Sequence, residues 1–132
     1  MRGKLPIVQQ YMTRIPMEVE QCQTVDEAIQ LMRAHGIRHV PVMNGSHLKG
    51  IVSDRDLLQI RLNDKHSGKH LLNDICQQDV LSVSPIAQVE EVAGLMLKRK
   101  VGSAVVVDGG FVVGIFTTTD ALRVLSDLGG PS

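Results

Sequence analysis

The chain has 132 residues, a length that fits one domain or two very small ones. Hydrophobic residues make up 43% and charged residues 21%, which excludes a chain that is disordered throughout. The formal net charge is zero and aromatic residues are 2%, so the composition favours neither nucleic acid nor a membrane surface as a partner. No apolar run is long enough to span a bilayer and the N-terminus lacks a secretory apolar region, so we expect a cytoplasmic protein.

The first half of the chain predicts a mixed α/β unit. Thr24 is a good N-cap, and Glu27 completes a capping box three residues later. An apolar stripe of helical period follows and ends at Gly36, and Asn44-Gly45 marks a hairpin turn between two short apolar strands. The elements expected in chain order are a strand at 17–19, a helix at 25–35, strands at 40–43 and 48–52, and a helix at 54–62.

The second half repeats the first at an offset of 64 residues. Gly50-Ile51 is matched by Gly114-Ile115, and Asp56 by Asp120, without a gap between these positions. The elements expected after a polar linker at 63–70 are a strand at 81–83, a helix at 89–98, strands at 104–107 and 111–116, and a helix at 118–128. Each copy is too small to bury its apolar face alone, so we expect the two β-α-β-β-α copies to pack about a pseudo-twofold axis.

The repeat resembles a pair of CBS domains, the regulatory module named after cystathionine β-synthase. The resemblance rests on several segments together, since any one alone would be weak. These segments are 11–16 (YMTRIP), 24–28 (TVDEA), 36–42 (GIRHVPV), 50–57 (GIVSDRDL), 101–108 (VGSAVVVD) and 114–122 (GIFTTTDAL). Within the family, the chain is similar to the stand-alone pairs related to acetoin-utilisation accessory proteins.

The resemblance implies a Bateman module with CBS repeats at 7–62 and 71–128 and two pseudo-symmetric clefts between them. In this family such clefts bind adenosine-bearing ligands, here AMP, ADP, ATP or S-adenosylmethionine, and their occupancy regulates another protein. The sequence carries no catalytic domain, so the regulated protein would be a separate chain. The resemblance also implies a homodimer.

Two motifs are the main candidates for ligand binding, and both have a purely structural explanation. They are Gly-x-x-Ser-x-x-Asp, with Ser53 and Asp56, and Gly-x-x-Thr-x-x-Asp, with Thr117 and Asp120. A hydroxyl followed three residues later by an acid, where a strand meets a helix, is a capping box. An aspartate there could instead accept both hydroxyls of a ribose, and the resemblance favours this role.

Further ligand positions follow from the resemblance. Arg38, His39 and Arg55 would converge on phosphate, which suits the planar donors of arginine, and Thr119 takes the position of Arg55 in the second copy. The adenine slot would be formed by Ile15, Pro16, Met17, Val80 and Leu81. Taken one at a time, Arg38, His39 and Arg55 are better explained as solvated surface charge, and ordinary core packing explains the adenine-slot segments equally well.

The two clefts are expected to differ. Arg38-His39 of the first copy is replaced by Gly102-Ser103 in the second, and Arg55 by Thr119. The first copy therefore offers cations beside its ribose motif, whereas the second has none within its own motif. We predict that the first cleft binds nucleotide phosphates more tightly.

Other chemistry finds little support in the sequence. No catalytic triad or carboxylate pair is visible, so we expect no enzyme. The histidine pairs His35–His39 and His66–His70 lack a third ligand, and the two cysteines have no metal-type or redox-type spacing, so we expect no metal site.

Two alternatives to a sensor remain: a structural or dimerisation module with empty clefts, and a regulatory subunit of a separate enzyme. Gly94 interrupts a predicted helix and suggests a close helix contact, as across a dimer interface.

Overall fold

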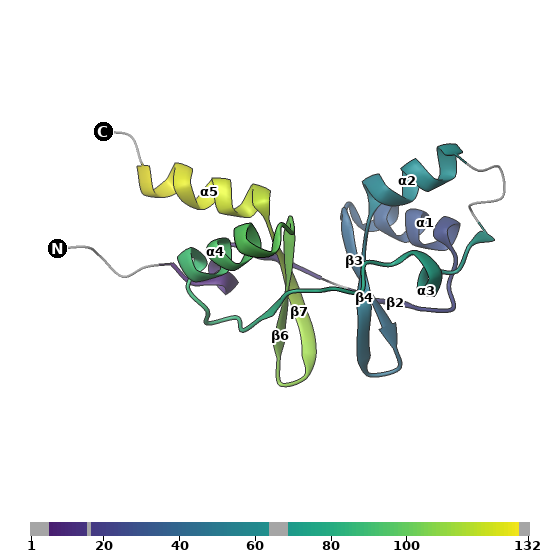
Figure 1. The fold of residues 1–132 in the computed structure, drawn as a ribbon, viewed down its shortest axis with the longest axis horizontal. Coiled ribbons are helices and arrows are strands. Elements are labelled where there is room, and N and C mark those ends of the chain that lie inside the picture. Colours follow the sequence, from purple (N-terminus) through teal and green to yellow (C-terminus); the bar gives the residue numbers. More distant parts are fainter. Residues whose placement is uncertain (1–5, 16, 64–68, 130–132) are drawn as a thin grey trace. The chain divides into compact units, whose positions relative to one another are not determined.

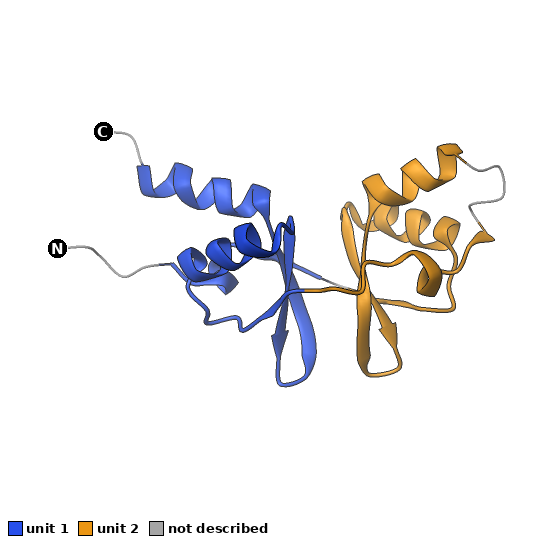
Figure 2. Cartoon of the chain, in the orientation of Figure 1, with its two compact units in different colours: residues 1–15, 81–132 blue, residues 16–80 orange. Residues whose placement is uncertain are grey.

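The computed structural model describes residues 6–15, 17–63 and 69–129. The chain forms two compact units, and each unit combines segments from both sequence repeats. Unit 1 comprises residues 1–15 and 81–132, and unit 2 comprises residues 16–80 (Figure 2). The predicted α/β architecture of two repeats is confirmed.

Unit 2 is a three-stranded sheet with two long helices over one face (Figure 1). The sheet order is β2-β3-β4, with β2 parallel to β3 and β3 antiparallel to β4. Its elements are β2 (Val19–Glu20), α1 (Val25–His35), β3 (His39–Asn44), β4 (His47–Ser53), α2 (Asp54–Asn63) and α3 (Leu72–Ile75). The predicted helices and hairpin strands are confirmed to within a residue or two, whereas α3 was not predicted.

Unit 1 repeats this plan with one more strand. The sheet order is β1-β7-β6-β5, and α4 and α5 lie over one face (Figure 1). Its elements are η1 (Val8–Gln10), β1 (Thr13–Arg14), β5 (Ser82–Val83), α4 (Val89–Arg99), β6 (Ser103–Asp108), β7 (Phe111–Thr117) and α5 (Thr118–Gly129). The sequence did not predict η1 or β1, and part of the predicted linker, 64–68, lies outside the described residues.

The first segment of each repeat is exchanged between the units. Thr13 of the first repeat pairs with Ile115 on β7, and Gln77 of the second repeat pairs with Ile51 on β4. Gln77 and Ile51 exchange both backbone hydrogen bonds, at 2.9 and 3.0 Å. Thr13 and Gln77 are 64 residues apart, so the same position of each repeat extends the sheet formed by the other repeat's hairpin.

The capping box predicted for Thr24 and Glu27 is present at the start of α1. Thr24 Oγ1 accepts a hydrogen bond from the Glu27 N–H at 3.3 Å, and Glu27 Oε1 accepts one from the Thr24 N–H at 3.2 Å. The Thr24 N–H and the Thr24 hydroxyl both donate to the Glu27 carboxylate, and these bonds lower the pKa of Glu27, the backbone bond contributing most. Gly36 ends the helix with φ 63°, a conformation that glycine adopts without a Cβ penalty.

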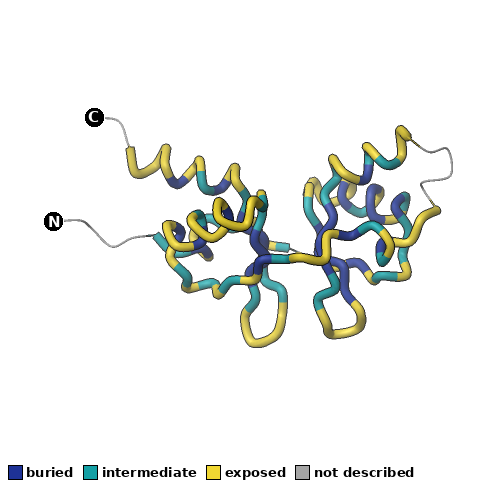
Figure 3. Tube along the Cα trace, in the orientation of Figure 1, coloured by how far each residue is buried: buried dark blue, intermediate teal, exposed yellow. Residues whose placement is uncertain are grey.

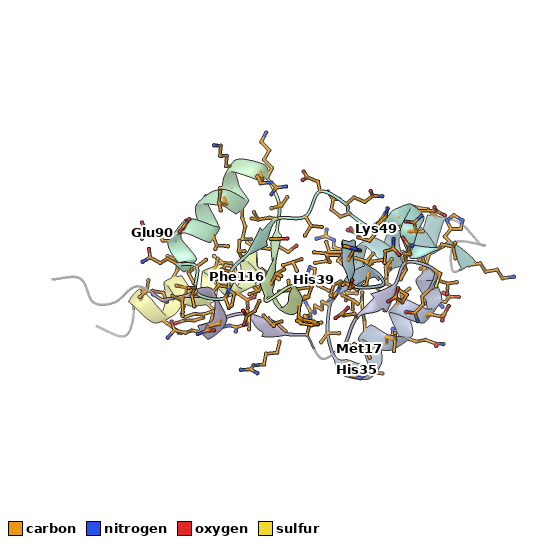
Figure 4. The ribbon with its side chains drawn as sticks, turned by 90° about the horizontal axis from the view of Figure 1, so that it is seen from below. Met17, His35, His39, Lys49, Glu90 and Phe116 are labelled. Atoms are coloured by element: carbon orange, nitrogen blue, oxygen red, sulfur yellow. The ribbon has the colours of Figure 1, made fainter. Side chains whose placement is uncertain are left out.

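Each unit buries its own apolar cluster between sheet and helices (Figure 3). Met32 and Leu57 lie in the cluster of unit 2, and Phe116 is fully buried in that of unit 1. Phe116 lies on β7 at the centre of unit 1 in Figure 4. The Tyr11 hydroxyl donates to Asp127 Oδ2 at 2.7 Å, which fastens the N-terminal segment to α5 and raises the pKa of Tyr11. The core is thus assembled separately in each unit.

The two cysteines differ sharply in accessibility. Cys22 is exposed, whereas Cys76 is buried beside Gly50, and this burial raises the pKa of the Cys76 thiol. Since the thiolate is the reactive species, a thiol reagent should label the native chain rapidly at one position only. Mass spectrometry of the wild type and of Cys22→Ser checks this expectation. Rapid labelling of native Cys22→Ser would contradict the burial of Cys76.

Candidate functional site

The first candidate motif gathers at one end of the β3–β4 hairpin. Ser53 is the last residue of β4 and pairs with His39 at the start of β3. The Asp54 N–H donates to the Arg38 carbonyl at 2.9 Å, which joins the first turn of α2 to the loop before β3. The structure therefore places Arg38, His39 and the Ser53–Asp56 turn at the same end of this hairpin. His39 is labelled on β3 in Figure 4.

The carboxylate of Asp56 is available for a ligand. The Asp56 N–H donates to Ser53 Oγ at 3.1 Å, which is one half of a capping box. Within the described part of the chain, no hydrogen bond or ion pair reaches the Asp56 carboxylate, and the residue is exposed. Arg38 and Arg55 are exposed as well. This turn thus presents an open carboxylate and two cations on one unit.

The second motif uses the same residue types in a closed arrangement. Asp120 Oδ2 accepts hydrogen bonds from the Thr117 N–H at 2.9 Å and from Thr117 Oγ1 at 3.1 Å, and the Asp120 N–H donates to Thr117 Oγ1 at 3.3 Å. Asp120 Oδ1 lies 3.3 Å from Arg123 Nη2. Asp120 is only 1% exposed. This aspartate therefore caps α5 and pairs with Arg123, so both of its oxygens are occupied.

Arg123 is the residue that sequence reasoning missed. It lies one helical turn after Asp120, a spacing at which opposite charges meet on a helix. The equivalent position of the first repeat is Gln59, which carries no charge. This single difference would have predicted a closed second aspartate and an open first one.

The remaining predicted positions are divided between the units. Thr119 is exposed on the first turn of α5. Of the predicted adenine slot, Ile15 and Leu81 belong to unit 1, Met17 and Val80 to unit 2, and Pro16 lies outside the described residues. Leu81 is buried in the core of unit 1, and its carbonyl accepts from the Val105 N–H at 2.8 Å. The adenine slot stays a prediction.

Unit 2 also has a cavity beside the first motif. Its volume is about 290 Å³. It is lined by residues of α1, of the loop before β3 and of α2, namely Ile29, Met32, Arg33, Gly36, Ile37, Arg38, Asp54 and Leu58. Arg38 is the one predicted ligand residue in this lining, so the cavity reaches the edge of the motif without containing Ser53 or Asp56.

The structure also bears on metal binding and on membrane insertion. Among residues 6–15, 17–63 and 69–129, no group of three or more His, Cys, Asp or Glu side chains could hold a metal ion. The predicted pair His66–His70 lies partly outside these ranges. No helix in the same ranges combines the length and the apolar character needed to cross a bilayer.

The fold and the two motifs define a tandem-repeat α/β module in which each repeat has one hydroxyl-x-x-aspartate turn between its hairpin and the following helix. The family model described as "CBS domain" matches residues 8–63 and 72–127. The chain belongs to the CBS domain family.

Solved structures of similar chains agree with this assignment. A putative acetoin utilization protein from Vibrio cholerae is 36% identical, with a TM-score of 0.75, and the match covers 95% of this chain and 93% of that one. CBSX2 in complex with AMP is 26% identical, with a TM-score of 0.73, and the match covers 94% and 98% of the two chains. The CBS domain pair of protein MJ0100, in complex with 5-methylthioadenosine and S-adenosylmethionine, is 25% identical, with a TM-score of 0.78 and coverage of 92% and 97%.

Proposed function

We propose that the chain is a non-enzymatic, cytoplasmic sensor that binds an adenosine-bearing ligand and regulates a separate protein. The observation that carries this proposal is the open carboxylate of Asp56 on the turn that also carries Ser53 and Arg55, a turn hydrogen-bonded to the Arg38 backbone. A carboxylate can accept both ribose hydroxyls, and arginine binds phosphate through its planar donors. The complexes of CBSX2 with AMP and of the MJ0100 pair with S-adenosylmethionine support this class of ligand. AMP, ADP, ATP and S-adenosylmethionine are the candidates, and we propose that the sensor is a homodimer.

Ligand binding at the first motif is proposed to be tighter than at the second. A ligand at the second motif would have to displace Thr117 or Arg123 from Asp120, whereas Asp56 needs no such rearrangement. This cost adds to the lack of a cation within the second motif itself, where Gly102-Ser103 replaces Arg38-His39. The rearrangement of Asp120 and the missing cation would therefore both weaken ligand binding at the second motif.

A second function is favoured by the closed motif. Because Thr117 and Asp120 form a complete capping box, the second motif is explained without any ligand. If the first motif also served only to start α2, the chain would be a structural or dimerisation module. The experiment that follows separates the two functions.

A thermal-shift panel with AMP, ADP, ATP, NAD and S-adenosylmethionine tests the sensor. A ligand present at one hundred times its dissociation constant adds about 2.7 kcal/mol to the free energy of unfolding. For a chain of this size that corresponds to an increase in Tm on the order of 10 °C. We expect at least one adenosine compound to produce such a shift, and a panel with no shift would support the structural module.

A further inference from the structure

One side of α5 carries three charged groups in a row. Asp120, Arg123 and Asp127 follow one another at spacings of three and four residues, which place them on the same side of a helix. Arg123 Nη2 lies 3.3 Å from Asp120 Oδ1, and Asp127 is one helical turn further along α5. Arg123 and Asp127 are both exposed. The arginine therefore lies between two carboxylates and can turn from one to the other at the surface.

Asp127 also holds the N-terminal segment, residues 8–14, which belongs to the same unit as α5 (Figure 2). The Tyr11 hydroxyl donates to Asp127 Oδ2 at 2.7 Å, and this bond is the largest cause of the raised pKa of Tyr11. The positive charge of Arg123 acts in the opposite sense and lowers that pKa. Arg123 is thus close enough to Tyr11 for its charge to act there, and Asp127 has two neighbours that compete for its carboxylate.

The equivalent positions of unit 2 lack these partners. At the repeat offset, each of the three ionisable groups around Asp120 is replaced by a side chain that cannot ionise. The pairs are Arg123 and Gln59, Asp127 and Asn63, and Tyr11 and Ile75. The arrangement therefore belongs to the second motif alone and does not follow from the architecture that the repeats share.

A ligand on Asp120 has to take the place of Arg123. Asp120 Oδ2 already accepts two hydrogen bonds from Thr117, so Oδ1 is the oxygen that a ligand hydroxyl reaches by displacing the arginine. Ion pairs of exposed side chains are weak, so a small gain in ligand contacts is enough to move it. The displaced guanidinium meets Asp127 on the same side of α5, where it competes with the Tyr11 hydroxyl.

We propose that Arg123 is a two-position switch, which closes the second motif by pairing with Asp120 and loosens the N-terminal segment by pairing with Asp127. The switch rests on the proposed function for its trigger, an adenosine-bearing ligand at Asp120. Coupling of this kind acts in both directions. A change that frees Asp127 from Tyr11 therefore opens Asp120, and a change that removes Asp127 as a partner closes it.

Ultraviolet absorbance titration of Tyr11 tests the switch without a ligand. Tyr11 is the only tyrosine and the chain has no tryptophan, so the signal comes from one side chain. Asp120→Asn removes the charge that holds Arg123 but keeps an oxygen acceptor in place. The released arginine should pair with Asp127 and lower the pKa of Tyr11 in the full chain. Asp56→Asn removes the same charge from the equivalent position of the first repeat and should leave the titration unchanged.

The same substitution in the Arg123→Gln background separates the switch from a direct effect of charge. If Asp120 acted on Tyr11 only through space, Asp120→Asn would lower the pKa of Tyr11 equally in both backgrounds. The switch predicts a clear decrease when Arg123 is present and little change when it is absent. Equal decreases in the two backgrounds, or no decrease in either, with all variants folded by circular dichroism, would overturn the proposal.

Nucleotide binding at the second motif should respond to two further substitutions in opposite directions. Calorimetry with AMP and ATP in the Asp56→Ala background measures this motif alone. Tyr11→Phe leaves Asp127 available to Arg123 and should tighten binding about two- to fivefold. Asp127→Asn leaves Arg123 with Asp120 as its partner and should weaken binding by a similar factor.

The outcomes distinguish the switch from the proposed function. Changes in the same direction for Tyr11→Phe and Asp127→Asn would overturn the switch, as would nucleotide binding by the wild type that disappears wholly in Asp56→Ala. If the wild type bound no adenosine compound, the proposed function would fail, and the titration of Tyr11 would still decide whether Arg123 exchanges between the two carboxylates.

Discussion

Asp56→Ala is expected to abolish the tight binding of adenosine nucleotide, whereas Asp120→Ala leaves it largely intact. Asp56 offers an exposed carboxylate on the turn that carries Arg55 and is hydrogen-bonded through Asp54 to the Arg38 backbone, while the oxygens of Asp120 are held by Thr117 and Arg123. Hydrogen bonds to charged groups contribute about 1.5–3 kcal/mol each, so loss of two ribose contacts weakens binding by a hundredfold or more. Titration calorimetry with the nucleotide that gives the largest thermal shift measures this loss.

The two substitutions should affect folding stability in the opposite order, with Asp120→Ala the more destabilising. Asp120→Ala leaves the partly buried N–H and hydroxyl of Thr117 without their acceptor and should lower the free energy of unfolding by about 1–3 kcal/mol. Asp56→Ala removes an exposed carboxylate and should change stability by no more than about 0.5 kcal/mol. Urea denaturation of both variants measures the difference.

Asp54→Ala is a matched control for these measurements, since it removes a neighbouring carboxylate from the same turn of α2. It should retain tight binding. If Asp120→Ala lost tight nucleotide binding while Asp56→Ala kept it, the tight site would be at the second motif and not at the first.

Gly114→Ala and Gly50→Ala are expected to destabilise the fold by about 1–3 kcal/mol each, and by more if the sheet cannot adjust. A Cβ at Gly114 would lie 2.6 Å from Met12 Sδ and 2.9 Å from the Thr13 carbonyl oxygen. A Cβ at Gly50 would lie 2.5 Å from the Gln77 carbonyl oxygen. The absence of a side chain at each glycine therefore lets a segment of the other repeat pack against the strand, Met12–Thr13 at Gly114 and Cys76–Gln77 at Gly50.

Gly102→Ala is the control for these two substitutions, because its Cβ would make an ordinary contact with Thr118 Oγ1 at 3.6 Å. Chemical denaturation should show little change for this variant. Equal stability of Gly114→Ala and Gly102→Ala would contradict the close packing of β1 on β7.

The long elements and the motif turns could be predicted because their signals are local. The Thr24–Glu27 capping box, the turn at Asn44-Gly45 and the helical stripes each lie within a few residues, and the structure confirms the elements they mark. The repeat then extended the same assignment to the second half.

The exchanged segments could not be predicted, since they depend on pairing between distant residues. The two-residue strand β1 pairs with β7, and Gln77 forms an isolated bridge with Ile51; segments this short carry almost no hydrophobic period. The left-handed turn that ends α4 could not be predicted either. Lys100 adopts φ 58° there, at the position that Gly36 occupies in the first repeat. Nothing local in Lys98-Arg99-Lys100 signals that turn.

The sequence predicted which residue types form the candidate site, but not whether each aspartate side chain is exposed or buried. The sequence gives both aspartates the same motif, and only their surroundings separate an exposed Asp56 from a buried Asp120. Arg123 adds to this difference through a side-chain contact that the motif does not include.

A crystal structure of the full chain with the tightest-binding nucleotide of the panel tests the central proposal most directly. The account predicts that the ribose hydroxyls lie within hydrogen-bond distance of the Asp56 carboxylate, with phosphate oxygens on Arg38 or Arg55. A nucleotide whose ribose contacts Asp120 while the Ser53–Asp56 turn stays empty would contradict it.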